Sequence, residues 1–379
     1  TEGGKYEYQR RNHPHVSSLL PLDVQCTRAI GKFLGRHNLN ALRDSGSFRF
    51  IVDWLVTLSC PSVAFVKPSA AFNFLQLSSS DHLKKYKYGS HFMQEIHLYE
   101  RLSATKCTGF VFFVHGGAWG SGMPWMYRLV AGGFLQAGMS VAIVGYRTYP
   151  CADVNAQVHD LESAATFLAA NRPDLFENSH GEKRRNCCLI GHSSGAHIAL
   201  LMLVERVRKY MSFTSLTSFR REARFTTVDF DSFVGLSGPY SIDRHFHFEA
   251  RRGVEELSPM KAACGHSSEE FFHNSPAFRL KKILTEFDED EKHCICKFVP
   301  RMLLVHGIED TTVPFTATSL AANILTHCGV AQCDEAYISK TGHQDTIMHF
   351  MLGGKTQETV MAWLVQMKQP AKNQIQSKI

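Results

Sequence analysis

The pentapeptide at residues 191–195, Gly-His-Ser-Ser-Gly, constrains the fold of this chain more than any other segment. It lies between the apolar run 187–190 and the apolar, helix-like run 196–200. A serine on a sharp turn between a strand and a helix needs glycine two residues to either side, where side chains would obstruct the bend. The helix that follows directs its first amides toward negative charge near the serine. The segment therefore predicts a nucleophilic Ser193; an ordinary serine in a glycine turn is the alternative.

A second glycine-rich segment follows an earlier apolar run. Residues 115–119 read His-Gly-Gly-Ala-Trp. The backbone of such a loop can aim successive N–H groups at one point, as an oxyanion hole requires. We expect the amides of Gly117 and Ala118 to serve this purpose, with Gly116 as an alternative, and the amide of Ser194 to add a third donor.

The side chains next to these donors have less specific predictions. Trp119 and His192 are candidate walls of a substrate pocket, and simple packing is the alternative for Trp119. His115 is expected to make a structural hydrogen bond, and the role of catalytic base is its alternative.

An acid and a base follow two later apolar strands. Residues 306–310, His-Gly-Ile-Glu-Asp, offer Asp310 or its neighbour Glu309, and His343 follows the expected strand 335–338. His349 is close by, but it falls in a hydrophobic helical stretch and is expected in the core. The order Ser, Asp, His, with each residue just past a strand, is the order that this type of fold requires.

Together these residues can activate a serine as a nucleophile. A serine hydroxyl is a poor nucleophile unless an imidazole accepts its proton, and the imidazole needs a carboxylate to fix its tautomer. Ser193, His343 and Asp310 fill the three roles beside candidate oxyanion amides. This chemistry requires no metal and no organic cofactor.

From about residue 81 the chain alternates short apolar strands with helices, which indicates an α/β fold with a mostly parallel sheet covered on both faces. Residues 1–80 are expected to form an N-terminal helical extension, 81–370 the catalytic domain and 371–379 a flexible tail. The charged, histidine-rich and irregular interval 244–291 interrupts the rhythm after a strand and is interpreted as a cap or lid. The strands expected are 91–99, 109–114, 140–146, 186–190, 230–236, 301–305 and 335–338, and the helices 123–137, 154–171, 194–210, 316–327 and 356–367.

Composition argues against nucleic-acid binding, a disulfide framework and a cysteine metal site. The net charge of +6 comes from scattered basic pairs without a basic stripe, so nucleic-acid binding is not expected. The 11 cysteines are an odd number without a disulfide framework, which favours reduced thiols and an intracellular location, cytoplasmic or peripheral on an internal membrane. Cys294 and Cys296 beside His293 lack a second ligand pair nearby, so they favour solvated loop cysteines over a metal site.

The start of the chain shows no signal-peptide pattern. Its most apolar stretch, residues 48–66, is interrupted by charged residues and a proline. It therefore has too few consecutive apolar residues to span a membrane. We expect a buried or interfacial helix from about Ser47 to Leu58. Packing on the catalytic domain is favoured, and peripheral membrane contact through residues 48–66 is the alternative.

The motifs resemble those of α/β-hydrolase esterases with a His-Gly-Gly-x-Trp oxyanion loop, a group that includes kynurenine formamidases, feruloyl-esterase-like proteins and isoprenylcysteine α-carbonyl methylesterases. The resemblance to the methylesterases is the most extensive, covering roughly residues 86–364. It is carried by segments 87–90 and 96–99, by Tyr-Arg-Thr-Tyr-Pro at 146–150, by Gly-His-Ser-Ser-Gly-Ala-His-Ile-Ala at 191–199, by 237–240 with 245–246 and 274–276, and by Lys-Thr-Gly-His-Gln-Asp at 340–345. The family pattern favours Asp310 over Glu309.

The resemblance implies a serine carboxylesterase acting on a small or lipidated ester, such as a prenylcysteine methyl ester. A kynurenine formamidase with the same triad is the nearest alternative, and a non-catalytic binding module on this fold is a more distant one. Plant members carry membrane helices before the domain, and none is visible here. Apart from the short matches at 245–246 and 274–276, the interval 244–291 does not align with the family, and substrate choice is expected to reside there.

Overall fold

The computed structural model describes residues 68–79, 81–100, 108–176, 186–211, 227–256, 258–285, 287 and 299–366. Several sequence predictions concern residues outside these ranges: the helix at 47–58, the apolar stretch 48–66, the cysteines at 294 and 296, and the tail 371–379. They remain predictions.

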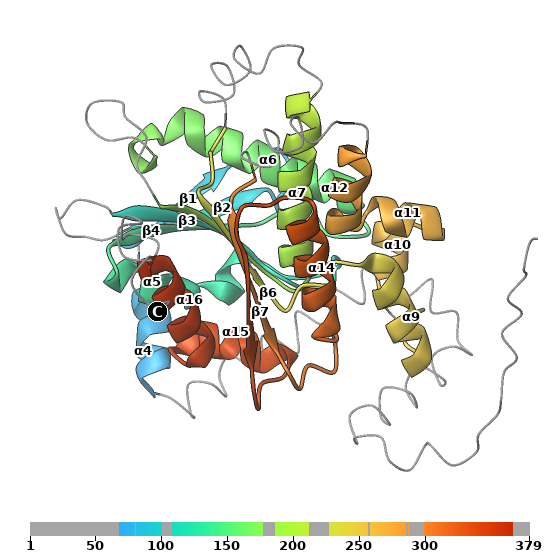
Figure 1. Ribbon diagram of the computed structural model, residues 1–379. Helices are drawn as coiled ribbons and strands as arrows, with labels where there is room; N and C mark the ends of the chain where they lie inside the picture. The colour runs from blue at the N-terminus through green and yellow to red at the C-terminus, as the bar shows by residue number, and fades with distance from the viewer. Residues whose placement is uncertain are drawn as a thin grey trace, which may run out of the picture.

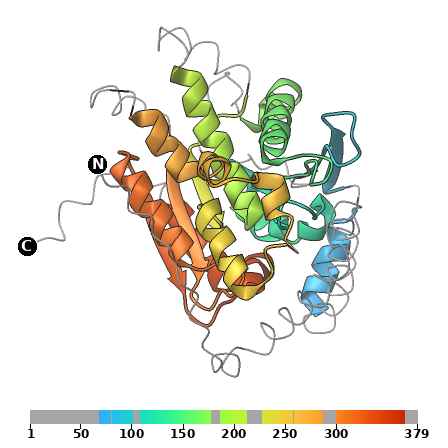
Figure 2. The same cartoon turned by 90° about the vertical axis from the view of Figure 1, so that its right-hand side faces the viewer.

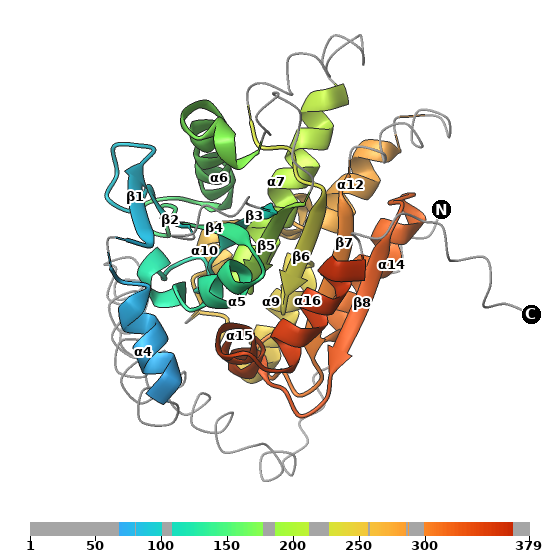
Figure 3. The ribbon, with the colours of Figure 1, turned by 90° about the vertical axis from the view of Figure 1, so that its left-hand side faces the viewer.

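The core of the fold is an eight-stranded sheet with the order β1-β2-β4-β3-β5-β6-β7-β8. β1 and β2 are antiparallel to their neighbours. The other six strands, β4, β3, β5, β6, β7 and β8 in sheet order, are all parallel. Figure 3 shows β1 and β8 at opposite edges of the sheet. The strands are β1 (Leu83–Lys87), β2 (Glu95–Tyr99), β3 (Gly109–Val114), β4 (Met139–Val144), β5 (Cys187–His192), β6 (Ser232–Leu236), β7 (Arg301–Gly307) and β8 (Cys333–Ile338).

The central strands are buried on both faces because a helical layer covers each face. In β3, Phe110 and Phe112 contribute to the hydrophobic core on one side, whereas Val111 and Phe113 contribute to the core on the other. Successive side chains of a strand point to opposite faces, so a strand between two helical layers is apolar throughout. This arrangement confirms the predicted α/β fold with a mostly parallel sheet.

Helices from distant parts of the chain form the two layers (Figure 1). The first layer contains α6 (Val154–Asn171), α7 (Ser194–Met211), α12 (Pro276–Leu284) and α14 (Thr316–His327). The second contains α5 (Val130–Gln136), α15 (His343–Leu352) and α16 (Lys355–Gln366), and α4 (Pro68–Gln76) leads into it through Leu77. Two short 3-10 helices, η1 (Pro124–Tyr127) and η2 (Pro173–Leu175), complete these connections.

The helix predicted at 123–137 is divided into η1 and α5, and two other regions also differ from the sequence predictions. β1 was not predicted, because Leu-Lys-Lys-Tyr-Lys is too charged to look like a strand; it pairs at the sheet edge, where its lysines reach solvent. The interval 244–291 is not irregular in its described part. It forms α9 (Ile242–Arg252), α10 (Met260–Cys264), α11 (Ser268–His273) and α12. Figure 2 shows this segment, yellow to orange, beside α7.

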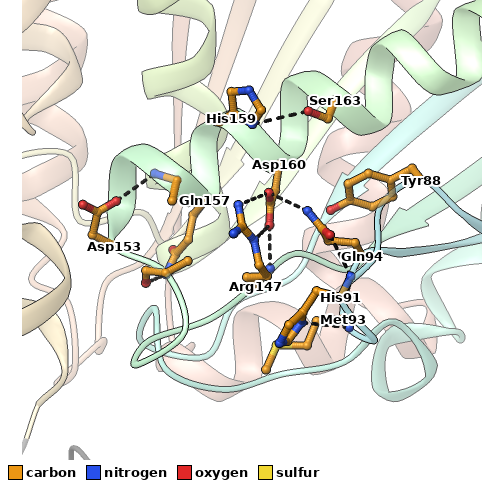
Figure 4. Close-up of polar contacts among 12 residues, drawn as sticks. Tyr88, His91, Met93, Gln94, Arg147, Asp153, Gln157, His159, Asp160 and Ser163 are labelled. Carbon is orange, nitrogen blue, oxygen red and sulfur yellow. Dashed lines mark hydrogen bonds and ion pairs between the residues drawn. The ribbon is translucent and has the colours of Figure 1, made fainter.

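An ion pair between the partly exposed Arg147 and the buried Asp160 fixes the segment between β4 and α6 (Figure 4). The Asp160 side chain has no solvent exposure and accepts bonds from the Arg147 guanidinium at 2.7 and 2.9 Å and from the Arg147 backbone amide at 2.9 Å. Gln94 adds a fourth bond at 2.9 Å. Because every carboxylate lone pair has a donor, the buried charge is compensated. The pair anchors the start of the Tyr-Arg-Thr-Tyr-Pro segment on α6.

None of the helices in the described ranges has the length and apolar character needed to cross a bilayer.

Candidate active site

Ser193 occupies the turn between β5 and α7. Its φ is 53°, in the left-handed region that side chains rarely adopt, and its backbone amide donates to Leu236 of β6 at 2.8 Å. Neither flanking glycine has room for a side chain. A Cβ on Gly191 would lie 2.5 Å from the Ala196 Cα, and one on Gly195 would lie 2.3 Å from the His115 carbonyl oxygen. Close packing of the turn therefore explains the glycine spacing.

Ser193 is hydrogen-bonded to His343, and His343 to Asp310. The distance from His343 Nε2 to Ser193 Oγ is 3.0 Å, and the distance from His343 Nδ1 to Asp310 Oδ2 is 2.7 Å. All three residues are more than nine-tenths buried. Because a carboxylate accepts, Nδ1 of His343 carries a proton and Nε2 is free to accept the serine proton. The structure thus connects the three residues predicted from the sequence by two consecutive hydrogen bonds.

Four donors hold the Asp310 carboxylate. Oδ1 accepts from the amides of Thr312 at 2.9 Å and Val313 at 2.8 Å, and Oδ2 accepts from His343 and from His306, whose Nε2 is 3.2 Å away. Burial acts to raise the pKa of Asp310, but hydrogen bonds from the two histidines outweigh burial and hold the pKa well below its ordinary value. Asp310 is therefore ionised at neutral pH and fixed in orientation.

His306 is the second imidazole on this carboxylate, and sequence analysis did not assign it a role. Its side chain has no solvent exposure. Nε2 lies 2.9 Å from the Val313 carbonyl oxygen, which can only accept, so Nε2 carries a proton that it also directs at Asp310. Nδ1 bonds to Thr318 Oγ1 at 2.8 Å. The available signal was its position at the end of β7, four residues before Asp310.

The predicted oxyanion loop follows β3 with an unusual backbone. The φ angles of Gly117, Ala118 and Trp119 are 134°, 49° and 59°. Positive φ in two consecutive non-glycine residues is strained, at a cost of about 1–3 kcal/mol each, and needs support from surrounding contacts. Within the described part of the chain, the amides of Gly117, Ala118 and Ser194 donate to no other protein group.

Trp119 supplies much of that support. Its carbonyl oxygen accepts from the Tyr149 amide at 2.8 Å and from Gln157 Nε2 at 2.9 Å. Its indole Nε1 donates to Nδ1 of His197 at 3.1 Å, and Nε2 of His197 donates to the Asn274 carbonyl oxygen at 2.6 Å. Burial lowers the pKa of His197 to about 4, so the imidazole is neutral and this one tautomer satisfies both bonds. His197 thus links the loop to the segment that precedes α12.

The other candidate residues occupy distinct places. Trp119 is almost fully buried, and so is His192, whose ring centroid lies 5.2 Å from that of His343. Burial, with a smaller effect from His343, lowers the pKa of His192 to about 3, so it is neutral. His115 is fully buried, its ring stacks on Tyr146 with centroids 4.5 Å apart, and its Nδ1 donates to Gly116.

Glu309 and His349, the alternatives to Asp310 and His343, take no part in the hydrogen bonds of the triad. Glu309 is exposed and accepts from the Lys340 amide at 3.2 Å. His349 is on α15 and is half-buried, so the prediction that it lies in the core holds only in part. Among the residues that the structure describes, no three histidine, cysteine or acidic side chains are grouped as a metal ion would require.

A parallel sheet with a serine on the turn after one strand, an acid after β7 and a histidine after β8 defines the α/β-hydrolase class. A comparison with solved structures agrees with this fold: esterase B from Lactobacillus rhamnosis (HN001) matches with a TM-score of 0.56 and 16% sequence identity, over 83% of this chain and 95% of that one.

The chain belongs to the BD-FAE family, whose model matches residues 96–325. A probable isoprenylcysteine alpha-carbonyl methylesterase from Oryza sativa subsp. japonica is 27% identical over 275 residues, which are 72% of this chain and 60% of that protein. A kynurenine formamidase from Meyerozyma guilliermondii is 26% identical over 245 residues, 64% of this chain and 80% of that protein. The chain therefore spans less than two thirds of the length of the rice methylesterase that it matches.

Proposed function

We propose that this protein is a serine carboxylesterase that works through an acyl-enzyme on Ser193. His343 takes the hydroxyl proton as Ser193 attacks the ester carbonyl, and it returns that proton to the departing alcohol. A water molecule then attacks the acyl-enzyme, with His343 again accepting the proton. Asp310 keeps the imidazole in the required tautomer and stabilises its charged form.

The proposed oxyanion hole consists of the amides of Gly117, Ala118 and Ser194. Each tetrahedral intermediate places negative charge on the former carbonyl oxygen, and donors already aimed at that point stabilise it without reorganisation. The absence of other acceptors for these three amides in the described structure supports this assignment. One such donor is typically worth about 3 kcal/mol of transition-state stabilisation.

The observation that carries the proposal is the uninterrupted hydrogen-bond chain from Ser193 through His343 to Asp310. It also argues against a non-catalytic binding module, which would have no need for a complete triad. The test is labelling by a fluorophosphonate probe. The wild type should be labelled and Ser193→Ala should not.

The control for that experiment is Ser163→Ala, which removes a serine on α6 whose hydroxyl bonds only to His159 in the described structure. It should be labelled like the wild type. Labelling of Ser193→Ala at the wild-type rate would overturn the assignment of the nucleophile.

We infer a prenylcysteine methyl ester as the substrate to test first, because the methylesterase relatives are named for that reaction. The formamidase match supports N-formylkynurenine as the second candidate. The triad does not discriminate between them, since acyl transfer to water uses the same residues for both. Hydrolysis of both compounds and of p-nitrophenyl acetate, compared by kcat/KM, would rank them.

We further propose that the interval 244–291, which contains most of α9 and all of α10, α11 and α12, is a cap that selects the substrate. The interval follows the carboxyl end of β6, on the side of the sheet where the turn of Ser193 lies, and its Asn274 carbonyl oxygen accepts a hydrogen bond from His197 of α7. Membrane contact through residues 48–66 and an intracellular location are proposals that rest on the sequence. Fractionation of the protein with and without residues 1–80 would test the former.

A further inference from the structure

Two imidazoles share one oxygen of the Asp310 carboxylate. Nδ1 of His343 donates to Oδ2 at 2.7 Å, and Nε2 of His306 lies 3.2 Å from the same oxygen. Oδ2 is the atom through which Asp310 acts on the catalytic base. His306 is therefore placed to change how Asp310 acts on His343.

The contacts of the His306 ring fix its orientation. The side chain has no solvent exposure. Nε2 lies between two acceptors, the Asp310 carboxylate and the Val313 carbonyl oxygen at 2.9 Å, so it carries a proton. Nδ1 lies 2.8 Å from the Thr318 hydroxyl, which can donate to it. A neutral ring with its proton on Nε2 satisfies all three contacts, and it would lose them if it turned away from Asp310.

This second donor has a substantial effect on the carboxylate. Burial acts to raise the pKa of Asp310, and the hydrogen bonds from His306 and His343 lower it, the bond from His306 by the larger amount. A carboxylate that already shares its charge with one donor attracts a further proton less strongly. His306 and His343 therefore compete for the negative charge of Oδ2.

The charge on Oδ2 affects how readily His343 holds a proton. During catalysis that charge stabilises the imidazolium that forms when Ser193 loses its proton. In the free enzyme the same charge favours protonation of His343 by solvent, and a protonated imidazole cannot accept the serine proton. A second donor on Oδ2 weakens both effects, and the second of them limits activity in acidic solution.

Few other charges act on this pair among the residues that the structure describes. His192 faces the His343 ring from the β5–α7 turn, but burial lowers the pKa of His192 to about 3, so its charge does not change near neutral pH. Asp345 of α15 is exposed and accepts from the Gly342 amide at 2.9 Å. Glu309 is exposed as well. Because water screens these two carboxylates, the second imidazole on Oδ2 has the stronger effect.

We propose that His306 is a positioning residue that sets the lower pH limit of the triad. By donating to Oδ2, it holds the carboxylate of Asp310 in place and withdraws part of its charge. His343 then stays unprotonated, and able to accept the serine proton, in more acidic solution. The inference rests on the proposed esterase function, because it concerns the base of that mechanism.

The test compares two amides in place of the imidazole. The amide nitrogen of Gln can take the position of Nε2 and donate to Asp310, whereas the shorter Asn ends near the position of Nδ1, toward Thr318. Profiles of kcat/KM for p-nitrophenyl acetate would be measured from about pH 5 to about pH 9, where the acid limb reports the base of the free enzyme. In His306→Asn this limb should move to higher pH by about 0.5–1 pH unit, a loss of about 3- to 10-fold on the limb, with the plateau within about 2-fold of the wild type. The limb of His306→Gln should stay within about 0.2 pH unit of the wild type.

The matched control is His327→Gln, on the same helix as Thr318, which removes an exposed imidazole bonded to the Asn323 carbonyl oxygen of its own helix. Its profile should coincide with that of the wild type. Coincident acid limbs in His306→Asn and the wild type, or equal shifts in His306→Asn and His306→Gln, would overturn the proposal. A role in packing alone would lower the plateau and leave the limb in place.

The rate of fluorophosphonate labelling gives a second readout, because it needs the activated serine but no ester substrate. It should show the same shift of its acid limb. If labelling shifts in His306→Asn but no ester is hydrolysed by the wild type, the role of His306 stands and the esterase proposal fails. If p-nitrophenyl acetate is hydrolysed with coincident acid limbs, the esterase proposal stands and the role of His306 fails.

Discussion

The two sides of Ser193 differ in how completely their polar groups are satisfied. On the β7–β8 side, both nitrogens of His343 and both oxygens of Asp310 have partners, and His306 adds another pair of bonds. On the α9 side, Glu249 Oε2 and His245 Nδ1 are buried without a hydrogen-bond partner among the residues that the structure describes. The acid–base side is therefore fully hydrogen-bonded among the described residues, whereas the cap side retains polar atoms without partners there.

The difference suggests which functions depend on geometry that is already fixed before a substrate binds. Proton transfer demands fixed geometry, and a saturated network provides it. Substrate choice depends on what a site leaves unsatisfied, since a ligand that lacks the matching group then pays for the unpaired acceptors. Substitutions on the first side should reduce turnover of every substrate, and substitutions on the second should discriminate among substrates.

The largest effect is expected from Asp310→Asn. The amide oxygen would stay with the backbone amides of Thr312 and Val313, so the NH₂ group would face the donors of His343 and His306. His343 would then adopt the wrong tautomer, and kcat should fall by about 10³- to 10⁴-fold for all esters. Steady-state assays with p-nitrophenyl acetate would measure it.

Glu309→Gln is the control for that substitution, because Glu309 is the adjacent, exposed acid. Its kcat should stay within about 2-fold of the wild type. A large loss in Glu309→Gln together with an active Asp310→Asn would reverse the assignment and break the comparison.

An intermediate effect is expected at Trp119, where the two sides meet. Trp119→Phe retains an aromatic ring but removes the donor to His197, so the strained loop loses one of its supports. We expect kcat to fall by about 10-fold, with little change in KM, because oxyanion donors act on the transition state. A rise in KM at constant kcat would instead make Trp119 a substrate contact.

The smallest effect is expected from His306→Leu, as a change in stability. His306 helps to lower the pKa of Asp310, and a carboxylate with a lowered pKa stabilises the folded state fully above its unfolded pKa of about 3.9. Wild type loses this contribution as pH falls below that value. The variant should therefore be less stable by about 1 kcal/mol at pH 7, and the difference should shrink below about pH 4.

Urea unfolding at pH 7 and at about pH 3 would measure that difference. His306→Gln, whose amide can reach the position of the imidazole Nε2, should recover part of the loss at pH 7. A difference that is the same at both pH values would mean that His306 acts on packing alone.

Local signals in the sequence were sufficient for the elements with strong periodicity. The bounds of β3, α6 and α14 agree with the prediction because an apolar run or an amphipathic period defines them. α9 was missed because Ile-Asp-Arg-His-Phe-His-Phe-Glu-Ala-Arg-Arg is mostly polar, and its polarity includes the buried His245 and Glu249. The segment is amphipathic, but its low overall hydrophobicity hid that period from sequence reasoning.

The nucleophile position followed from its glycines, but the residues that support it did not. His197 and His306 contact groups far along the chain or around a loop, and one sequence with 20 histidines gives no sign of which of them meet. Their roles depend on the tertiary fold, which brings α7 to the oxyanion loop and β7 to β8.

The bond from His197 ends on the backbone of Asn274, and this has a consequence for how the protein tolerates change. A carbonyl oxygen is present whatever the side chain, so replacing Asn274 need not disturb Trp119, although it would remove the side-chain bond to the Cys264 carbonyl oxygen. Inserting or deleting a residue between α11 and α12 would move the carbonyl itself. Homologous caps should therefore be exchangeable in composition but not in length at this junction.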